Sequence, residues 1–83
     1  MVKIVFSAHA KLQLAERRIS QREVLETIRK PDHITRQLNN RLQAVRGRER
    51  KGKEYLLVVI YDETQSVQEI VTAFYTSKIK KYL

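Results

Sequence analysis

The sequence contains no cysteine, and this absence narrows both the fold and the chemistry. A chain without thiols has no disulfide bonds and no thiolate ligands, so a structural zinc site is excluded. Long apolar runs are also missing. The opening segment MVKIVF leads straight into polar sequence, which fits neither a signal peptide nor a membrane-spanning helix. We therefore expect a soluble, cytoplasmic protein with no membrane partner.

Glycine is scarce as well, and it occurs only at Gly47 and Gly52. Two isolated glycines exclude a glycine-rich phosphate loop of the Walker or dinucleotide-binding type. The nine acidic residues include no spaced pair typical of a magnesium site. We expect no cofactor and no metal, and a metal-independent mechanism for any nuclease activity.

Positive charge is what the sequence has in excess. Lys and Arg number 17 against 9 Asp and Glu, which gives a formal net charge of +8. Such a field attracts polyanions by electrostatic steering and by counterion release. RNA, DNA and an acidic antidote protein are the partners that would respond to it. The plain alternative is a basic protein with a well-solvated surface.

The first part of the chain predicts a strand followed by a helix. Residues 2–6 are rich in strand-forming side chains, and Ser7 follows as an N-cap. Four apolar residues recur at helical spacing and are expected to be buried: Ala8, Leu12, Ala15 and Ile19. A polar row lies beside them: His9, Gln13 and Arg17.

A second helix is predicted to begin after Ser20. Glu23 stands three positions later, which completes a capping box. Pro31 ends this helix near Arg29 or Lys30. Its apolar face consists of Val24, Leu25 and Ile28.

Beyond Pro31 the apolar pattern alternates, which predicts strands. A strand over 34–38 and its antiparallel return over 41–48 are joined at Asn39-Asn40, a good tight-turn pair. Residues 54–61 are apolar on both faces, which indicates a central strand, and 67–75 should pair with it.

The predicted element order is β-α-α-β-β-β-β within a single domain, residues 1–83. A chain of this length supports one modest core. We expect an α+β fold with two helices packed on one face of a mainly antiparallel sheet. The tail 76–83 is expected to form one helical turn or to dock as an extended segment.

The densest basic segment runs from Arg41 to Lys53. Its cations are Arg41, Arg46, Arg48, Arg50, Lys51 and Lys53. If Leu42 and Ala44 face the core, alternation places Arg46 and Arg48 on that same face, where the helices no longer cover the sheet. This predicts a basic, partly sheltered groove. The alternative is a solvated hairpin.

His9 is one of two histidines, and its place in the first helical turn favours the neutral imidazole, which can act as a base. The alternative is a histidine that helps to cap its helix. Arg17 lies two turns further along the same row, so both side chains could address one phosphate.

Aromatic and basic residues are interleaved near the end of the sequence. Tyr75 and Tyr82 flank Lys78, Lys80 and Lys81, a combination that stacks bases and binds phosphates. For Tyr82 the alternative is docking of the tail onto the core.

Four stretches of the sequence resemble a family of small uncharacterised bacterial domains allied to the RelE/ParE toxin superfamily. They are FSAHAKLQLAERRIS, EVLETIRKPD, EYLLVVIYDE and IVTAFYTSKIKKYL, which together span nearly the whole chain. The most specific parts are Ser7 with His9, the Arg-Ile-Ser junction at 18–20, and residues 72–75. The resemblance implies a toxin-like fold related to microbial ribonucleases, with members that cleave messenger RNA on the ribosome and others that act on gyrase.

RelE-like nucleases use basic side chains on the sheet and an aromatic or imidazole group near the chain end, which the resemblance places at Arg46, Arg48 and Tyr82. The ribose 2′-hydroxyl would attack the adjacent phosphate, with His9 or Tyr82 accepting its proton. Arg17, Arg46 or Lys78 would stabilise the charge that builds on phosphorus. His9 is the better base, because an unperturbed tyrosine has a pKa near 10.

The candidate catalytic residues are therefore His9, Arg17, Arg46 and Tyr82. The candidate RNA-binding residues are Arg41, Arg48, Lys53, Tyr75, Lys78 and Lys81. Our leading hypothesis is the toxin of a toxin–antitoxin pair, an endoribonuclease silenced by an acidic antitoxin. The alternatives are a non-catalytic RNA-binding or ribosome-binding module and a protein-binding inhibitor of the gyrase type.

Overall fold

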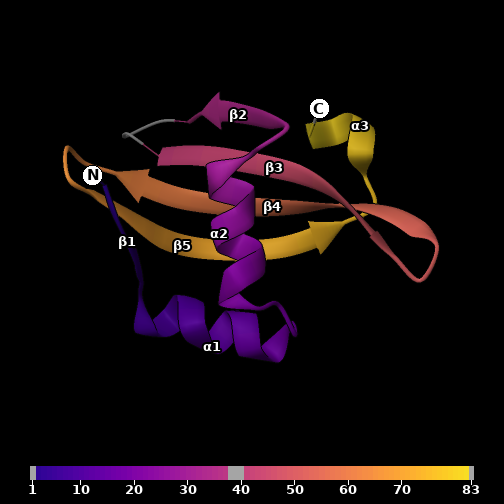
Figure 1. Cartoon of the computed structure of the whole chain (residues 1–83), viewed down its shortest axis with the longest axis horizontal. Helices are drawn as coiled ribbons and strands as arrows, with labels where there is room; N and C mark the ends of the chain where they lie inside the picture. The colour runs from indigo at the N-terminus through magenta and orange to yellow at the C-terminus, as the bar shows by residue number, and fades with distance from the viewer. Residues whose placement is uncertain (1, 38–40, 83) are drawn as a thin grey trace.

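The computed structural model describes residues 2–37 and 41–82, and these form an α+β domain with one five-stranded mixed sheet and three helices (Figure 1). In chain order the elements are β1 (Lys3–Phe6), α1 (Ala8–Glu16), α2 (Gln21–Arg29), β2 (His33–Arg36), β3 (Arg41–Arg50), β4 (Lys53–Glu63), β5 (Val67–Thr76) and α3 (Ile79–Tyr82). The α+β class is confirmed. No helix in the described ranges is long and apolar enough to cross a membrane.

The strands lie in the order β1-β5-β4-β3-β2. From β2 to β5 each strand pairs antiparallel with the next, as expected, and β4 occupies the centre. β1 is different because it pairs parallel with β5, which makes the sheet mixed rather than purely antiparallel. The first strand of the chain therefore lies beside the last one.

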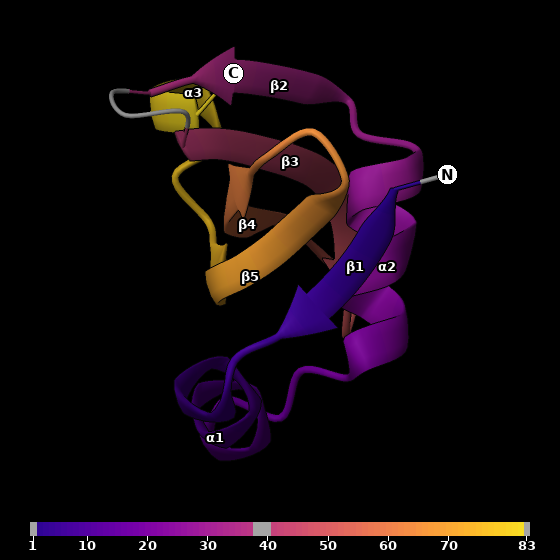
Figure 2. The same cartoon turned by 90° about the vertical axis from the view of Figure 1, so that its left-hand side faces the viewer.

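Side chains pack on both faces of the sheet. α2 crosses one face over β3 and β4, and together with α1 it covers the larger core (Figure 1). α3 lies on the opposite side of the sheet from α2, over a smaller core (Figure 2). The larger core includes Ala10, Leu14, Ile19, Val24, Leu42, Ala44, Leu57, Val59, Tyr61, Ile70 and Ala73. The smaller core has Val45, Leu56 and Val58 at its centre.

Both helix starts follow their predicted caps. Ser7 Oγ accepts a hydrogen bond of 3.0 Å from the backbone N of Ala10. Ser20 and Glu23 form the complete capping box, with bonds of 3.1 Å and 2.7 Å. α2 ends at Arg29, as Pro31 predicts.

The predicted buried stripe of α1 is wrong. Ala8, Leu12 and Ala15 are exposed, Leu12 by 59 %, whereas Ala10 and Leu14 are buried. Apolar residues surround most of this short helix, so their spacing alone does not select one face. The prediction for Ile19 is correct, because its side chain is 5 % exposed.

β2 is an exposed edge strand, and its four residues are all accessible to solvent. It pairs with β3 in the predicted antiparallel sense, from His33 opposite Val45 to Arg36 opposite Leu42. The predicted turn at Asn39-Asn40 and the strand position of Leu38 lie outside the described residues. The predicted helical turn of the tail is present as α3.

Candidate nucleic-acid interface

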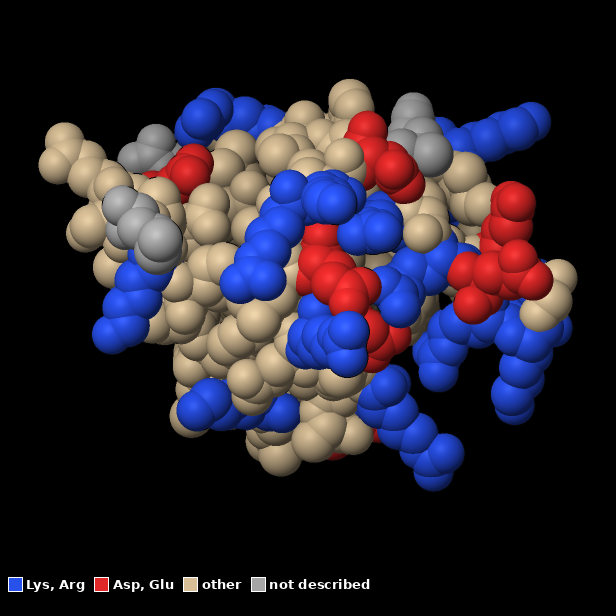
Figure 3. Space-filling view, viewed as in Figure 1, with Lys and Arg blue, Asp and Glu red and all other residues tan. Residues whose placement is uncertain are grey.

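A pocket of about 410 Å³ lies where β3 turns into β4. Its lining consists only of cationic and aromatic side chains: Arg50, Lys51, Lys53, Tyr55 and Tyr75. We call it the basic tyrosine pocket. Figure 3 shows Lys and Arg side chains projecting from the end of the molecule where this hairpin lies. The volume is within the range of small-molecule sites, about 300–1,000 Å³.

Strand alternation brings these side chains together. Arg50 is opposite Lys53 and Arg48 is opposite Tyr55 in the β3–β4 register, while Leu57 is opposite Tyr75 on β5. Residues two apart on a strand share a face, so all these side chains lie on the face that α2 partly covers. The prediction that Arg46 and Arg48 share the face of Leu42 and Ala44 is confirmed.

The two tyrosines contact each other and the cations around them. Their rings meet edge to face, with centroids 6.4 Å apart and planes at 79°. The Arg50 guanidinium carbon lies 4.6 Å from the Tyr75 centroid, and Lys53 Nζ lies 5.7 Å from the Tyr55 centroid. Both distances are within reach of a cation–π interaction. The pocket therefore presents positive charge over aromatic faces.

The turn that closes the hairpin has an unusual residue. Lys51 and Gly52 both have left-handed backbone angles, with φ of 51° and 75°. Glycine adopts this region freely, and asparagine and aspartate tolerate it, but lysine is disfavoured there. The turn nevertheless carries a lysine at the rim of the pocket.

Beside the pocket, α2 contributes two carboxylates to a network with the sheet. Tyr75 donates a hydrogen bond of 2.5 Å to Glu23 Oε1. Arg48 lies 3.9 Å from the same oxygen and 3.2 Å from Glu26 Oε2. Arg46 donates to the backbone carbonyl of Glu26 at 3.3 Å. The predicted groove is therefore filled by α2 at Arg46 and Arg48, and it opens only further along, at Arg50.

This network shifts two pKa values in opposite directions. Burial by itself raises the pKa of Glu23, but hydrogen bonds from Tyr75 and Ser20 and the charge of Arg48 outweigh it and lower that pKa. Burial and the bond to Glu23 raise the pKa of Tyr75 to about 12. At neutral pH Glu23 is an acceptor and Tyr75 a proton donor.

The guanidinium of Arg17, predicted to address one phosphate together with His9, is bound to β5 in this structure. Arg17 donates to Thr72 Oγ1 at 2.9 Å and to the carbonyl of Ala73 at 2.8 Å, so it closes the edge of β5 beyond the part paired with β1. Thr72 in turn donates to Gln13 Oε1 at 2.6 Å. His9 is an exposed residue of α1.

Tyr82 and Arg46 lie on opposite faces of the sheet. Tyr82 belongs to α3 and packs on the smaller core, with its ring 6.0 Å from that of Phe74. This matches the alternative interpretation, docking of the tail. The structure therefore does not bring Arg46 and Tyr82 together in one centre.

The predicted RNA-binding residues lie in three separate places. Lys53 and Tyr75 line the basic tyrosine pocket and Arg48 adjoins it. Arg41 lies at the other end of β3 and binds both carboxylate oxygens of Asp62, at 2.8 and 3.2 Å. Lys78 and Lys81 are exposed in the tail, and Lys81 Nζ lies 5.6 Å from the ring of Tyr82.

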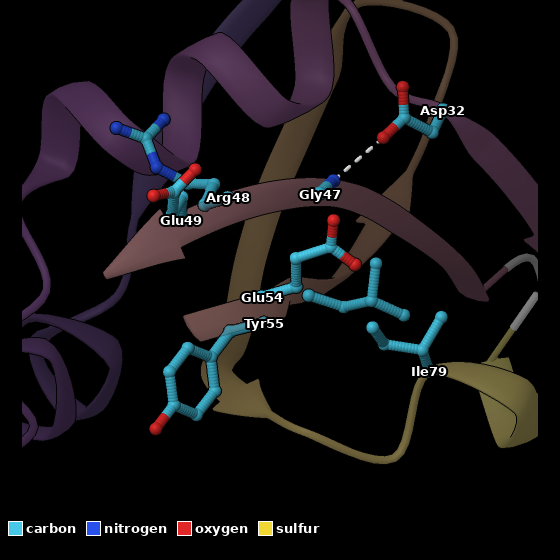
Figure 4. Close-up of a pocket in the computed structure, with 8 residues that line it drawn as sticks. Asp32, Gly47, Arg48, Glu49, Glu54, Tyr55 and Ile79 are labelled. Atoms are coloured by element: carbon cyan, nitrogen blue, oxygen red, sulfur yellow. Dashed lines mark hydrogen bonds between the residues drawn. The ribbon is translucent and has the colours of Figure 1, made fainter. Parts of the chain in front are cut away.

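A second pocket, of about 330 Å³, has three carboxylates and one arginine, Arg48, in its lining, and we call it the acidic pocket (Figure 4). It is lined in part by Asp32, Glu49, Glu54 and Ile79. Asp32 Oδ2 accepts a hydrogen bond of 2.6 Å from the backbone N of Gly47. Within residues 2–37 and 41–82, no group of three or more His, Cys, Asp or Glu side chains is arranged to hold a metal ion.

Sequence reasoning missed Tyr55. It also assigned Glu23 only to the helix cap and missed its contact with Tyr75. One local signal could have found Tyr55. A two-residue turn at Lys51-Gly52 places residue 50 opposite 53 and residue 48 opposite 55, which brings Tyr55 beside the arginines. The contact of Glu23 with Tyr75 spans 52 positions, and no local pattern reports it.

Comparison with known proteins gives one match. A family model described as a domain of unknown function, DUF4258, matches residues 6–75. No curated protein and no solved structure matches the chain. The matched residues run from the end of β1 to Tyr75 in β5 and include the whole basic tyrosine pocket. The chain belongs to the DUF4258 family.

Proposed function

We propose that this chain is the RNA-directed toxin of a toxin–antitoxin pair in the cytoplasm, and that it binds RNA in the basic tyrosine pocket and cleaves it without a metal. The observation that carries the RNA part is the pocket itself, with three cations around two tyrosines. Phosphates bind lysine and arginine, and bases stack on aromatic rings. The toxin part rests on the sequence resemblance to the RelE/ParE superfamily.

In the proposed reaction Glu23 acts as the base and Tyr75 as the acid. The Glu23 carboxylate accepts the proton of the ribose 2′-hydroxyl, whose oxygen attacks the adjacent phosphorus. The bond from phosphorus to the 5′-oxygen breaks, and that oxygen takes the phenolic proton of Tyr75. The 2.5 Å hydrogen bond returns a proton from Glu23 to Tyr75. The products are a 2′,3′-cyclic phosphate and a 5′-hydroxyl.

The arginines next to this network stabilise the charge of the reacting phosphate. Arg48 already contacts the carboxylates of α2, whereas Arg50 is exposed and lies over the ring of Tyr75. Arg50 is therefore the side chain that meets the phosphate first. In this scheme Glu23 replaces His9 and Tyr82 as the base.

An acidic antitoxin is the expected protein partner. The net charge of +8 attracts it over a distance, and acidic side chains over the pocket would compete with RNA for Arg50, Lys51 and Lys53.

A non-catalytic RNA-binding module is the second candidate. One observation favours it: Glu23 and Arg48 are already paired, and Glu23 also caps α2. Such a network can simply hold α2 on the sheet. The basic tyrosine pocket would then bind RNA without cleaving it.

The test uses purified protein with chelator, added to free RNA and to translating ribosomes. New RNA ends are mapped for the wild type, Glu23→Gln, Arg50→Ala and the control Lys11→Ala, which removes an equal charge from α1. We expect cleavage by the wild type and the control, and loss of cleavage with retained binding in Glu23→Gln. Binding by the wild type without cleavage would leave the second candidate, and no RNA binding would contradict both.

A further inference from the structure

The tip of the β3–β4 hairpin combines three features that oppose its stability. Arg50 lies directly opposite Lys53, and Glu49 lies directly opposite Glu54. Like charges in such cross-strand pairs are destabilising. The turn between them holds Lys51 in the left-handed region, which lysine disfavours.

The two like-charge pairs have the same result. Because side chains alternate along a strand, Arg50 and Lys53 point to the tyrosine face, and Glu49 and Glu54 point to the face of the acidic pocket (Figure 4). Exchanging residues 49 and 50 would pair opposite charges in both positions without changing composition. The hairpin instead keeps one sign of charge on each face. Local rules are broken in this way mostly at functional sites.

The tyrosine face suits one class of ligand. An unpaired base offers its flat face to a tyrosine ring or to a guanidinium, whereas a base in a duplex is covered by its neighbours. Tyr55 and Tyr75 provide such surfaces within one pocket. Lys51 and Lys53 stand at the rim for the phosphates on either side.

We propose that the hairpin tip, residues 49–54, binds unpaired nucleotides of single-stranded RNA, with a base on Tyr55 and Tyr75 and the flanking phosphates on Arg50, Lys51 and Lys53. The inference rests on the proposed function, because it names the substrate class of the same site. It adds that the like-charge pairs and the left-handed lysine make this hairpin less stable, and that the same residues bind the RNA.

The first experiment exchanges the two central charges in the double variant E49R/R50E. Composition and net charge stay the same, while both cross-strand pairs become complementary. We expect a higher thermal midpoint together with about a tenfold loss of affinity for a fluorescent single-stranded oligouridine. The slope of log affinity against log salt should also fall in magnitude by about 0.7, because one phosphate contact with a single strand is removed.

A second variant covers the case in which the exchange prevents folding. Lys51→Gly relieves the left-handed turn and removes one cation, so it too should be more stable and bind less tightly.

The base contact is tested by Tyr55→Leu against Tyr55→Phe. We expect the leucine variant to lose most of the preference for the oligouridine over the same strand in a duplex, and the phenylalanine variant to keep it.

The outcomes separate this inference from the proposed function. If the wild type binds the oligouridine and E49R/R50E, Lys51→Gly and Tyr55→Leu bind it equally well, the hairpin inference fails while an RNA-binding function stands. Equal affinity of the wild type for single strand and duplex would also overturn it. If the wild type binds no RNA, the proposed function fails and the inference fails with it.

Discussion

The hydroxyl of Tyr75 donates a 2.5 Å hydrogen bond to Oε1 of Glu23. The other oxygen of the same carboxylate accepts the backbone N–H of Ser20 at 2.7 Å. One side chain therefore caps the start of α2 and holds the end of β5. As a result, the cap of a helix and the edge of the basic tyrosine pocket form one hydrogen-bonded unit.

Tyr75 should ionise well above the ordinary range of a tyrosine pKa. Its raised pKa of about 12 results from burial and from the bond to Glu23. A spectrophotometric titration of tyrosinate absorbance should show a late component near pH 12 in the wild type. In Tyr75→Phe this component should be absent, and the earlier part of the curve should be unchanged. A wild-type curve that is complete before pH 11 would contradict the contact.

The same pKa shift predicts how stability depends on alkaline pH. The folded-state pKa of Tyr75 is raised above the unfolded value near 10, so its contribution is fully present below pH 10. It is lost as pH rises from about 10 through 12, because only the unfolded chain releases the proton in that interval. Denaturant unfolding across this interval should show a shallower decline in Tyr75→Phe than in the wild type.

Removing the cap of α2 should weaken the fold by a moderate amount. Ser20→Ala loses the hydrogen bond that its Oγ accepts from the backbone N of Glu23, which should lower the free energy of unfolding by about 1 kcal/mol. Ser20→Asp keeps a capping oxygen and should remain close to the wild type. Urea unfolding of the three proteins provides the comparison. Equal losses in both variants would mean that the hydroxyl has another role.

Arg17 should contribute to the stability of the fold and not to RNA binding. Arg17→Ala removes the donors to Thr72 and to the carbonyl of Ala73 and should lower the free energy of unfolding by about 1–2 kcal/mol. RNA affinity of the folded variant should change no more than that of Lys11→Ala, which loses the same charge. A selective loss of RNA binding in Arg17→Ala would restore the role predicted from the sequence.

Replacing each of the two leucines of α1 by alanine should have very different effects on the free energy of unfolding. Leu14 is 3 % exposed and Leu12 is 59 % exposed. Leu14→Ala should lower the free energy of unfolding by about 2–5 kcal/mol, whereas Leu12→Ala should change it by less than about 0.5 kcal/mol. The two variants make the same chemical change two positions apart, so thermal unfolding of the pair tests which face of α1 is buried.

Those two leucines also show where sequence reasoning ends. The caps at Ser7 and Ser20 were predictable because a cap depends on residues within three positions of it. The buried face of α1 was not, because apolar residues lie nearly all round the helix and the sheet selects among them. Arg17, placed in a catalytic row by its spacing from His9, instead meets an edge carbonyl 56 positions away.

The candidate site also has features that follow from local sequence and features that depend on how the elements pack. The charge of residues 41–53 and the alternation that aligns Arg46 with Arg48 are local, and both were predicted correctly. Which cations remain accessible to a ligand depends on where α2 crosses the sheet. Arg46 is bonded to α2, whereas Arg50 lies further along and lines the pocket. The place of Tyr82 depends on which face the tail reaches, and nothing within the tail determines that.

Because β1 pairs with β5, the order of synthesis determines when this part of the sheet can form. Ser7 and its acceptor Ile70 stand 63 positions apart, so β1 and α1 leave the ribosome long before the strand they pack against exists. Contacts between such distant segments form late in folding. Tyr75 belongs to that same late strand. A nascent chain therefore carries no complete basic tyrosine pocket until β5 has emerged.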